Sequence, residues 1–313
     1  MNIQSKRVFV IVVIVVTALL VFRAVAYPGQ VVKNSYEDNF PHIKGNYLVW
    51  QSKLSGDWEI FLYNIVTHEV ERITNNRYYD QSPKTDGDYV VWLGCNRSGG
   101  EIFLYDIANK KTIQITNDDN LDAPPQIADG KVVWTSYDVT ESVEPGEIFL
   151  YDIATKMTRQ LTHNSIDDSS PRFHNGTVIW GRADDQGAAL VIYDMNTGDI
   201  AIAPEGFTPE ISSQIDGDLR VLSRKVGNDR EIFVYNSTLY TYQQLTDNDF
   251  EDRSPCINGE NIAWVGGEGK SAEIFLNADI EPIENDFEID EPDPPPIDAP
   301  PPSEDESCFI KIL

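Results

Sequence analysis

Short runs of consecutive apolar residues alternate with polar turns along most of this chain. Two such runs are "YVVWLG" at 89–94 and "EIFLYDI" at 101–107. Short runs rich in Val, Ile, Tyr, Phe and Trp are typical of β-strands. No window shows the sustained spacing of three and four residues that an amphipathic helix requires. The pattern predicts an all-β chain, and because apolar residues are consecutive, both faces of each sheet must be covered.

The pattern repeats with a nearly constant period. A second apolar run, "EIFLY" or a variant of it, starts in phase at 59, 101, 147, 189, 231 and 273. Such periods signal repeat architectures, and four short strands in each unit predict a six-bladed β-propeller of four-stranded blades. A large residue marks the second strand of each unit at intervals of 42, 42, 46, 42 and 42 residues: Trp50, Trp92, Trp134, Trp180, Leu222 and Trp264.

The last unit lacks an outer strand in phase, and the missing piece lies near the beginning of the chain. "QVV" at 30–32 stands 42 residues before "RIT" at 72–74. We therefore expect 30–32 to form the outer strand of the blade that contains Trp264. Such a seam would join the two ends of the propeller and cover an exposed edge. The predicted propeller spans 27–280.

The order of motifs within a unit resembles a known repeat. An Asp, a Ser-Pro, an Asp-Gly turn, an apolar strand, "EIFLYD" and "LT" follow one another, and this order is similar to the TolB-type propeller repeat, a relative of the WD-repeat class. The likeness extends over about 30–280. It implies a propeller of the exported or cell-surface type, and it says much less about function, because one fold carries many sites.

Both ends differ from this body. Lys6 and Arg7 precede the apolar stretch 8–22 and the small residues 24–26, as in an export signal. Residues 1–26 are thus a signal peptide or, if uncleaved, an N-terminal membrane anchor. Residues 281–313 form a predicted disordered tail, because 281–307 contain eleven acidic residues, eight prolines and no Lys or Arg. We expect the propeller to lie outside the cytoplasm, either secreted, periplasmic or at the cell surface.

Charge and cysteine content limit the classes of partner. A net charge of −27 argues against nucleic acid and favours cations or basic partners. Three widely spaced cysteines, Cys95, Cys256 and Cys308, predict neither a disulfide framework nor a metal cluster. We expect a monomer that contacts membrane only through an uncleaved N-terminal segment.

A carboxylate precedes the innermost strand of each unit, so six carboxylates are expected around one mouth of the channel. They form either a cation site or port for a basic peptide, or they accept hydrogen bonds from nearby backbone N–H groups. No metal or other cofactor is expected, with Ca²⁺ as the alternative. The candidate residues are Asp38, Asp80, Asp122, Asp168, Glu210 and Asp252.

The in-phase tryptophans are predicted to pack in the core. Candidates for surface contact lie instead in or near the hairpins that join the second and third strands. Arg224 is a further candidate there, or a structural Arg of the repeat. The others are Trp58, Arg97, Tyr137, Arg182 and Arg230.

Motifs of familiar enzymes are missing from the sequence. The four histidines are scattered, and neither an H-E-x-x-H nor a G-x-S-x-G motif occurs. The leading hypothesis is therefore a non-catalytic module that binds a protein or another envelope component. One alternative is a glycan lyase or hydrolase with acids at the channel mouth, and another is a TolB-like accessory of envelope translocation.

Overall fold

The computed structural model of the chain describes residues 29–278 except 97–98, 140–144, 175, 185–186 and 205–213, together with 283–284. Strands dominate this part of the chain, and one turn of 3-10 helix, η1 (Gly269–Ser271), interrupts them. The prediction of an all-β chain is confirmed. The predicted N-terminal segment 1–26 and nearly all of the predicted tail lie outside the described residues.

Each repeat unit forms an antiparallel sheet in which consecutive strands are neighbours. Sheet 1 contains β3 (Glu37–Lys44), β4 (Tyr47–Leu54), β5 (Asp57–Asn64) and β6 (Glu69–Arg72). Sheet 2 contains β7 (Tyr79–Thr85), β8 (Tyr89–Cys95), β9 (Gly100–Asp106) and β10 (Lys111–Gln114). Sheet 3 contains β11 (Leu121–Asp122), β12 (Gln126–Ala128), β13 (Lys131–Tyr137), β14 (Glu147–Asp152) and β15 (Met157–Gln160).

The second half of the described chain continues in the same manner. Sheet 4 contains β16 (Asp167–His174), β17 (Thr177–Asp184), β18 (Gly187–Asp194) and β19 (Ile200–Ile202). Sheet 5 contains β20 (Ile215–Asp216), β21 (Leu219–Val226), β22 (Asp229–Asn236) and β23 (Thr241–Gln244). Sheet 6 contains β24 (Asp252–Asn258), β25 (Asn261–Gly266), β26 (Glu273–Leu276) and, from the other end of the chain, β1 (Gly29–Gln30).

The N-terminal strand completes sheet 6, as the repeat predicts. Gln30 pairs with Phe275 in β26, and the Val31 N–H donates to the Ile274 carbonyl at 2.7 Å. The paired strand begins one residue earlier than expected. Beyond it, β2 (Val32–Lys33) pairs in parallel with β27 (Ile283–Glu284), so two residues assigned to the tail from sequence lie in a strand beside the seam.

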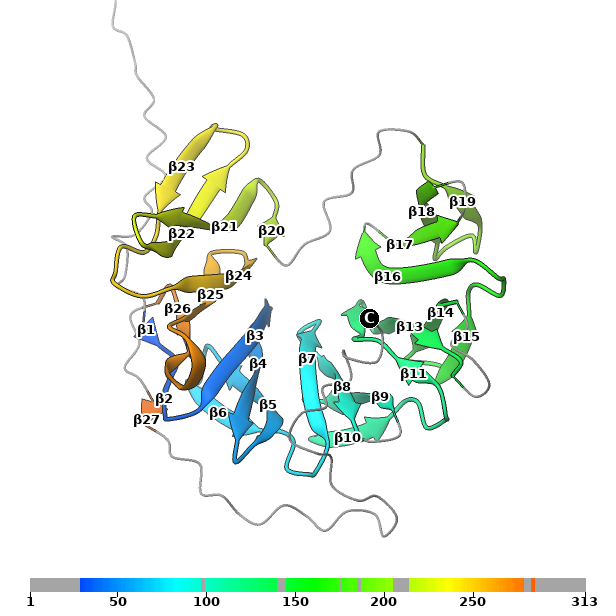
Figure 1. The fold of residues 1–313 in the computed structure, drawn as a ribbon, viewed down its shortest axis with the longest axis horizontal. Coiled ribbons are helices and arrows are strands. Elements are labelled where there is room, and N and C mark those ends of the chain that lie inside the picture. The colour runs from blue at the N-terminus through cyan, green and yellow to red at the C-terminus, as the bar shows by residue number, and fades with distance from the viewer. Residues whose placement is uncertain are drawn as a thin grey trace, which may run out of the picture.

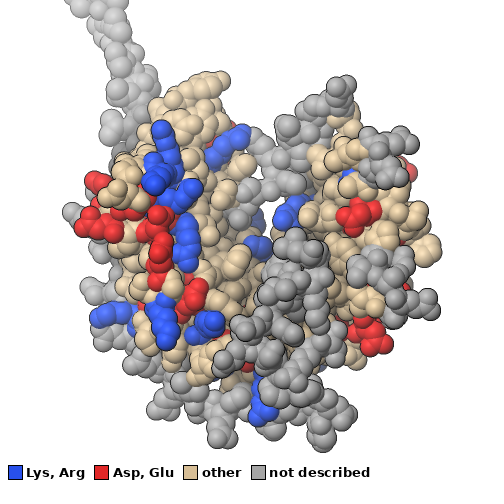
Figure 2. Space-filling view, viewed as in Figure 1, with Lys and Arg blue, Asp and Glu red and all other residues tan. Residues whose placement is uncertain are grey.

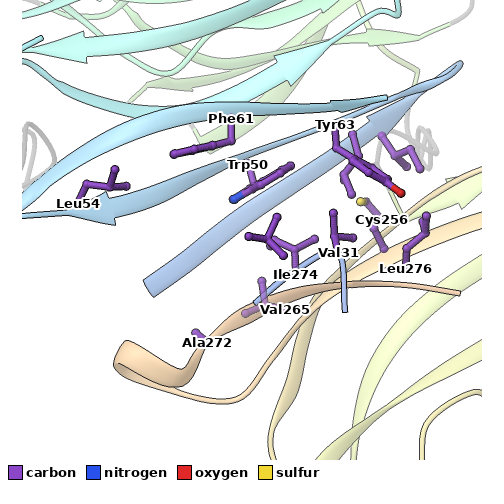
Figure 3. Packing of buried hydrophobic residues seen from close by; sticks show 14 residues of the cluster. Val31, Trp50, Leu54, Phe61, Tyr63, Cys256, Val265, Ala272, Ile274 and Leu276 are labelled. Atoms are coloured by element: carbon purple, nitrogen blue, oxygen red, sulfur yellow. The ribbon is translucent and has the colours of Figure 1, made fainter. Parts of the chain in front are cut away.

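The five tryptophans lie in the core, each only 1% exposed. Four of them stack on a Phe of the neighbouring strand, such as Trp92 on Phe103 at a centroid distance of 5.8 Å. Gly94 makes room for this stack, because a Cβ there would lie 2.6 Å from the Phe103 ring. Figure 3 shows the stack of Trp50 and Phe61 beside Val31, at the junction of sheets 6 and 1.

Five clusters of buried apolar residues join neighbouring sheets, and each tryptophan packs towards the preceding sheet. Among the described residues no such cluster joins sheets 4 and 5. Figure 1 shows the sheets arranged around a common centre, with an open side between β16–β19 and β20–β23. Leu222, the copy without tryptophan, belongs to sheet 5 and is only partly buried. Closure into a six-bladed ring stays a prediction.

Among the residues that the structure describes, none belongs to a helix of the length and apolarity that crossing a bilayer requires.

Candidate functional site

The described carboxylates of the predicted ring lie inside the protein, at most 1% exposed. In sheets 2, 3, 4 and 6 each accepts a hydrogen bond from the indole N–H of the tryptophan of its own sheet. These bonds are Trp92 to Asp80 at 2.8 Å, Trp134 to Asp122 at 3.2 Å, Trp180 to Asp168 at 2.9 Å and Trp264 to Asp252 at 3.1 Å. The carboxylate therefore holds the tryptophan in place. A binding role for these residues stays a prediction, and Glu210 lies outside the described residues.

A second carboxylate, from the third strand of the preceding sheet, supports this arrangement. Glu59 accepts hydrogen bonds from the Arg72 guanidinium at 2.8 Å and from the Thr74 hydroxyl. The Thr74 oxygen in turn accepts the Ile60 N–H at 2.8 Å. Asn76 connects the two acids, because its amide donates to Asp80 at 2.8 Å and its backbone N–H to Glu59 at 3.3 Å. Sheets 5 and 6 repeat the network through Glu231, Thr246 and Asn248.

The seam departs from this network. Val32 occupies the position that is Thr74 one unit later, so its side chain offers no hydroxyl to Glu273. Both oxygens of Asp38, the Trp50 indole nitrogen and one oxygen of Glu273 are buried without a hydrogen-bond partner. Burial raises the pKa of Asp38 to about 7, and the nearby polar groups of Ser52 and Trp50, which do not reach hydrogen-bond geometry, lower it only in part.

The pKa values of four further carboxyls of the network are also raised, chiefly by loss of water. Burial and, to a smaller extent, the neighbouring Asp38 charge raise the pKa of Glu273 to about 9. Burial raises the pKa of Asp122 and of Asp252 to about 6. The pKa of Asp80 is raised well above its usual value for the same reason. These groups therefore favour the protonated form in the fold more than free carboxyls do.

Arg182, predicted as a hairpin contact, binds a predicted ring carboxylate instead. Its guanidinium donates two hydrogen bonds to Asp168, at 2.7 and 2.9 Å. Trp58 is half-buried in β5, with the Lys53 ammonium 5.8 Å from its ring, and Tyr137 is half-buried at the end of β13. Arg97 lies outside the described residues. The structure thus brings together one predicted pair, Arg182 and Asp168.

Arg230 is exposed at the end of sheet 5, in the hairpin between β21 and β22. It stands opposite Lys225, and Arg224 on the same strand lies with its guanidinium carbon 6.0 Å from the Phe233 ring. All three cations are exposed. Figure 2 shows that most Lys and Arg atoms on this side of the molecule gather over β20–β26 and the strands of sheet 1. We call the surface formed by the hairpins between second and third strands the hairpin face.

A further set of channel residues was missed at the sequence level. The innermost strands of sheets 1, 2, 4 and 6 have a register shift before a residue that follows Pro. The residue after this shift differs from unit to unit, so it produces no visible repeat. The spacing of these residues, which follows the period of the repeat, is the sequence signal that could have identified the position. The four residues after a shift are His42, Lys84, Arg172 and Cys256, and the repeat places Gln126, which also follows Pro, and Gln214, which follows Ser213, at the same position.

No three His, Cys, Asp or Glu side chains gather as a metal site within the described part of the chain. Cys256 is a buried free thiol, and Cys95 at the end of β8 is disulfide-bonded.

No family model matches the chain, and no curated protein matches its sequence. Several solved structures, however, are similar to it. An oligogalacturonate lyase from Vibrio parahaemolyticus is similar with a TM-score of 0.54 and 13% identity, over 79% of this chain and 92% of that one. TolB from Acinetobacter baumannii is similar with a TM-score of 0.45 and 18% identity, over 71% of this chain and 57% of that one.

Structural neighbours thus include TolB and other β-propeller proteins, among them the β-propeller domain of the Trilobed protease from Pyrococcus furiosus (TM-score 0.44, 13% identity, over 78% of this chain and 81% of that one). The fold is that of a β-propeller. The resemblance to the TolB-type repeat is confirmed as a likeness of fold. The chain spans 57% and 64% of the lengths of two TolB chains that it resembles, and low identity leaves function to be argued from the site.

Proposed function

We propose that this chain is a six-bladed, extracytoplasmic β-propeller that binds a protein or another envelope component through its hairpin face. The predicted export segment supports the location. The observation that carries the binding role is the hairpin of sheet 5, where Arg224, Lys225 and Arg230 are exposed within two paired strands. Like charges opposite one another destabilise a sheet. No carboxylate of the described residues forms an ion pair with these three cations.

The residues that recur in the units serve the fold, so the hairpins are the part of the chain that would distinguish one partner from another. Trp, Asp, Glu and Thr recur in phase and are buried in contacts within the fold. The hairpins differ in sequence and length from sheet to sheet. Lys225 and Arg230 stand directly opposite each other, whereas Arg224 stands opposite Glu231. The like-charged pair favours a partner with an acidic surface, and opposite charge would speed its association.

A photo-crosslinking residue placed at Val226, which is 39% exposed at the end of β21, tests this proposal. A second probe at Leu239, which is 52% exposed in the turn at the other end of β22, is the matched control. We expect adducts with one identified envelope component from Val226 only. The triple variant R224S/K225S/R230S should lose them, whereas K110S/K111S should keep them. Equal adducts from both probes, or none, would contradict the proposal.

A second candidate, a glycan lyase or hydrolase, is favoured by the likeness to the oligogalacturonate lyase, which extends over most of both chains. The full chain would be incubated with polygalacturonate. A lyase would produce an unsaturated product with ultraviolet absorbance, and a hydrolase would release reducing ends without it. Folded chain that forms neither product faster than heat-unfolded chain would remove this candidate for that polymer.

A further inference from the structure

The four positions that follow the register shift, and the in-phase positions Gln126 and Gln214, lie at one level of the innermost strands. In the described strands, each pairs with the same position of the second strand: His42 with Val49, Lys84 with Val91, Gln126 with Val133, Arg172 with Ile179 and Cys256 with Ala263. The innermost strands surround the centre of the molecule (Figure 1). Equal register on strands around one centre places these residues in a ring, which we call the post-proline ring.

Only two members of the post-proline ring carry charge near neutral pH, and both are positive. Burial lowers the pKa of His42 well below its usual value, so this imidazole is neutral. Burial raises the pKa of the Cys256 thiol to about 12, so it is neutral as well. The two glutamines are uncharged. Lys84 and Arg172 therefore give the ring a net positive charge in a chain whose net charge is −27.

Neither cation has a carboxylate partner among the described residues. No hydrogen bond or ion pair within the described part of the chain reaches the Lys84 ammonium, which is partly buried. Arg172 donates one hydrogen bond to the Pro171 carbonyl, at 3.0 Å. The nearest repeated acids, Asp80 and Asp168, stand four residues earlier and are engaged with the buried tryptophans.

The charge of Arg172 also acts on Lys84, although the two residues belong to sheets 4 and 2. Burial and, to a smaller extent, the positive charge of Arg172 lower the pKa of Lys84, the nearby Cys256 raises it, and the resulting pKa is about 8. Lys84 is still mostly protonated at pH 7. Two partly desolvated cations at one level, with no carboxylate partner among the described residues, are unfavourable, and an anion bound to both would relieve both costs.

We propose that Lys84 and Arg172 bind an oxyanion, a carboxylate or phosphate group of a small molecule, at the post-proline ring. The planar guanidinium can donate two parallel hydrogen bonds to such a group, and the ammonium adds a compact charge from the innermost strand of sheet 2. This site goes beyond the proposed function, because it lies on the innermost strands and uses none of the cations of the hairpin face.

Titration calorimetry on the full chain tests the site, with inorganic phosphate and galacturonate as separate probes. We expect at least one probe to bind, and K84M and R172M each to weaken it by about tenfold. The control K110M removes an exposed ammonium that pairs with Glu71 and should leave binding unchanged. Binding of phosphate alone, or of galacturonate alone, would identify the source of the oxyanion. Absence of binding by both probes, or equal binding by the double variant K84M/R172M, would overturn the proposal.

A measurement on the wild-type chain makes the test independent of how the variants fold. Lys84 should react with an acylating reagent near pH 8, because its pKa is lowered to about 8. The bound probe should slow acylation of Lys84 and leave that of Lys110 unchanged, as quantified by peptide mass spectrometry. Equal acylation of Lys84 with and without both probes would count against the site. Binding should also weaken as the pH rises through about 8, where Lys84 loses its charge.

Discussion

Asp38 at the seam should make the protein less stable as the pH rises from about 4 to about 7. Its pKa is raised from 3.8 to about 7 in the fold, because the carboxyl is fully buried. A carboxyl whose folded pKa is raised keeps its proton in the fold after the unfolded chain has lost it. The contribution of Asp38 to stability is therefore complete below about pH 4 and is lost by about pH 7.

The size of this effect follows from the shift. One pKa unit corresponds to about 1.4 kcal/mol, so a shift of roughly three units corresponds to about 4 kcal/mol of unfolding free energy at pH 7. D38N keeps the shape of the side chain and removes the ionisation. We expect the variant to equal the wild type near pH 4 and to be more stable at pH 7, by up to about 4 kcal/mol.

Urea unfolding at several pH values between 4 and 7 measures the difference in unfolding free energy between D38N and the wild type. The contributions of the other titrating groups cancel in this difference. The matched control is D168N at the same repeat position of sheet 4, where Arg182 binds the carboxylate with two hydrogen bonds. Removing that charge breaks the ion pair between Arg182 and the buried Asp168, and we expect a loss of about 3 kcal/mol of unfolding free energy at pH 7. Parallel stability curves for D38N and the wild type would refute the assignment to Asp38.

Three further predictions concern the seam, the disulfide and the repeated network. Deleting 27–35 should lower the melting temperature by more than about 5 °C, because the deletion removes β1 and two fully buried valines. An unchanged melting curve would show that the seam is dispensable. Peptide mapping without reductant should find Cys95 in a disulfide and Cys256 as a free thiol, and a peptide linked through Cys256 would contradict this. T74V should lower the unfolding free energy by about 1–2 kcal/mol in chemical denaturation, because it removes a hydroxyl that bridges a backbone N–H and a buried carboxylate. An unchanged unfolding free energy would mean that these hydrogen bonds are not needed for stability.

The candidate site was predictable in position but not in orientation. The period placed Asp80 and Asp168 at equivalent points of two units, and the structure agrees. It did not show that each carboxylate turns towards the tryptophan of its own sheet instead of the channel mouth. Sequence spacing gives the height of a residue along a strand, whereas the direction of its side chain depends on the bulge and on the neighbouring sheet.

The amino-acid sequence by itself determined the strands, their phase and the partnership of the first strand with the last sheet, because consecutive apolar residues must be covered on both faces and an outer strand was missing. Only the tertiary structure decided which charges meet. Lys84 and Arg172 are far apart in the chain and share no motif, yet equal register around one centre brings them to the same level of the channel. Their interaction depends on distance through space, which the order of residues does not contain.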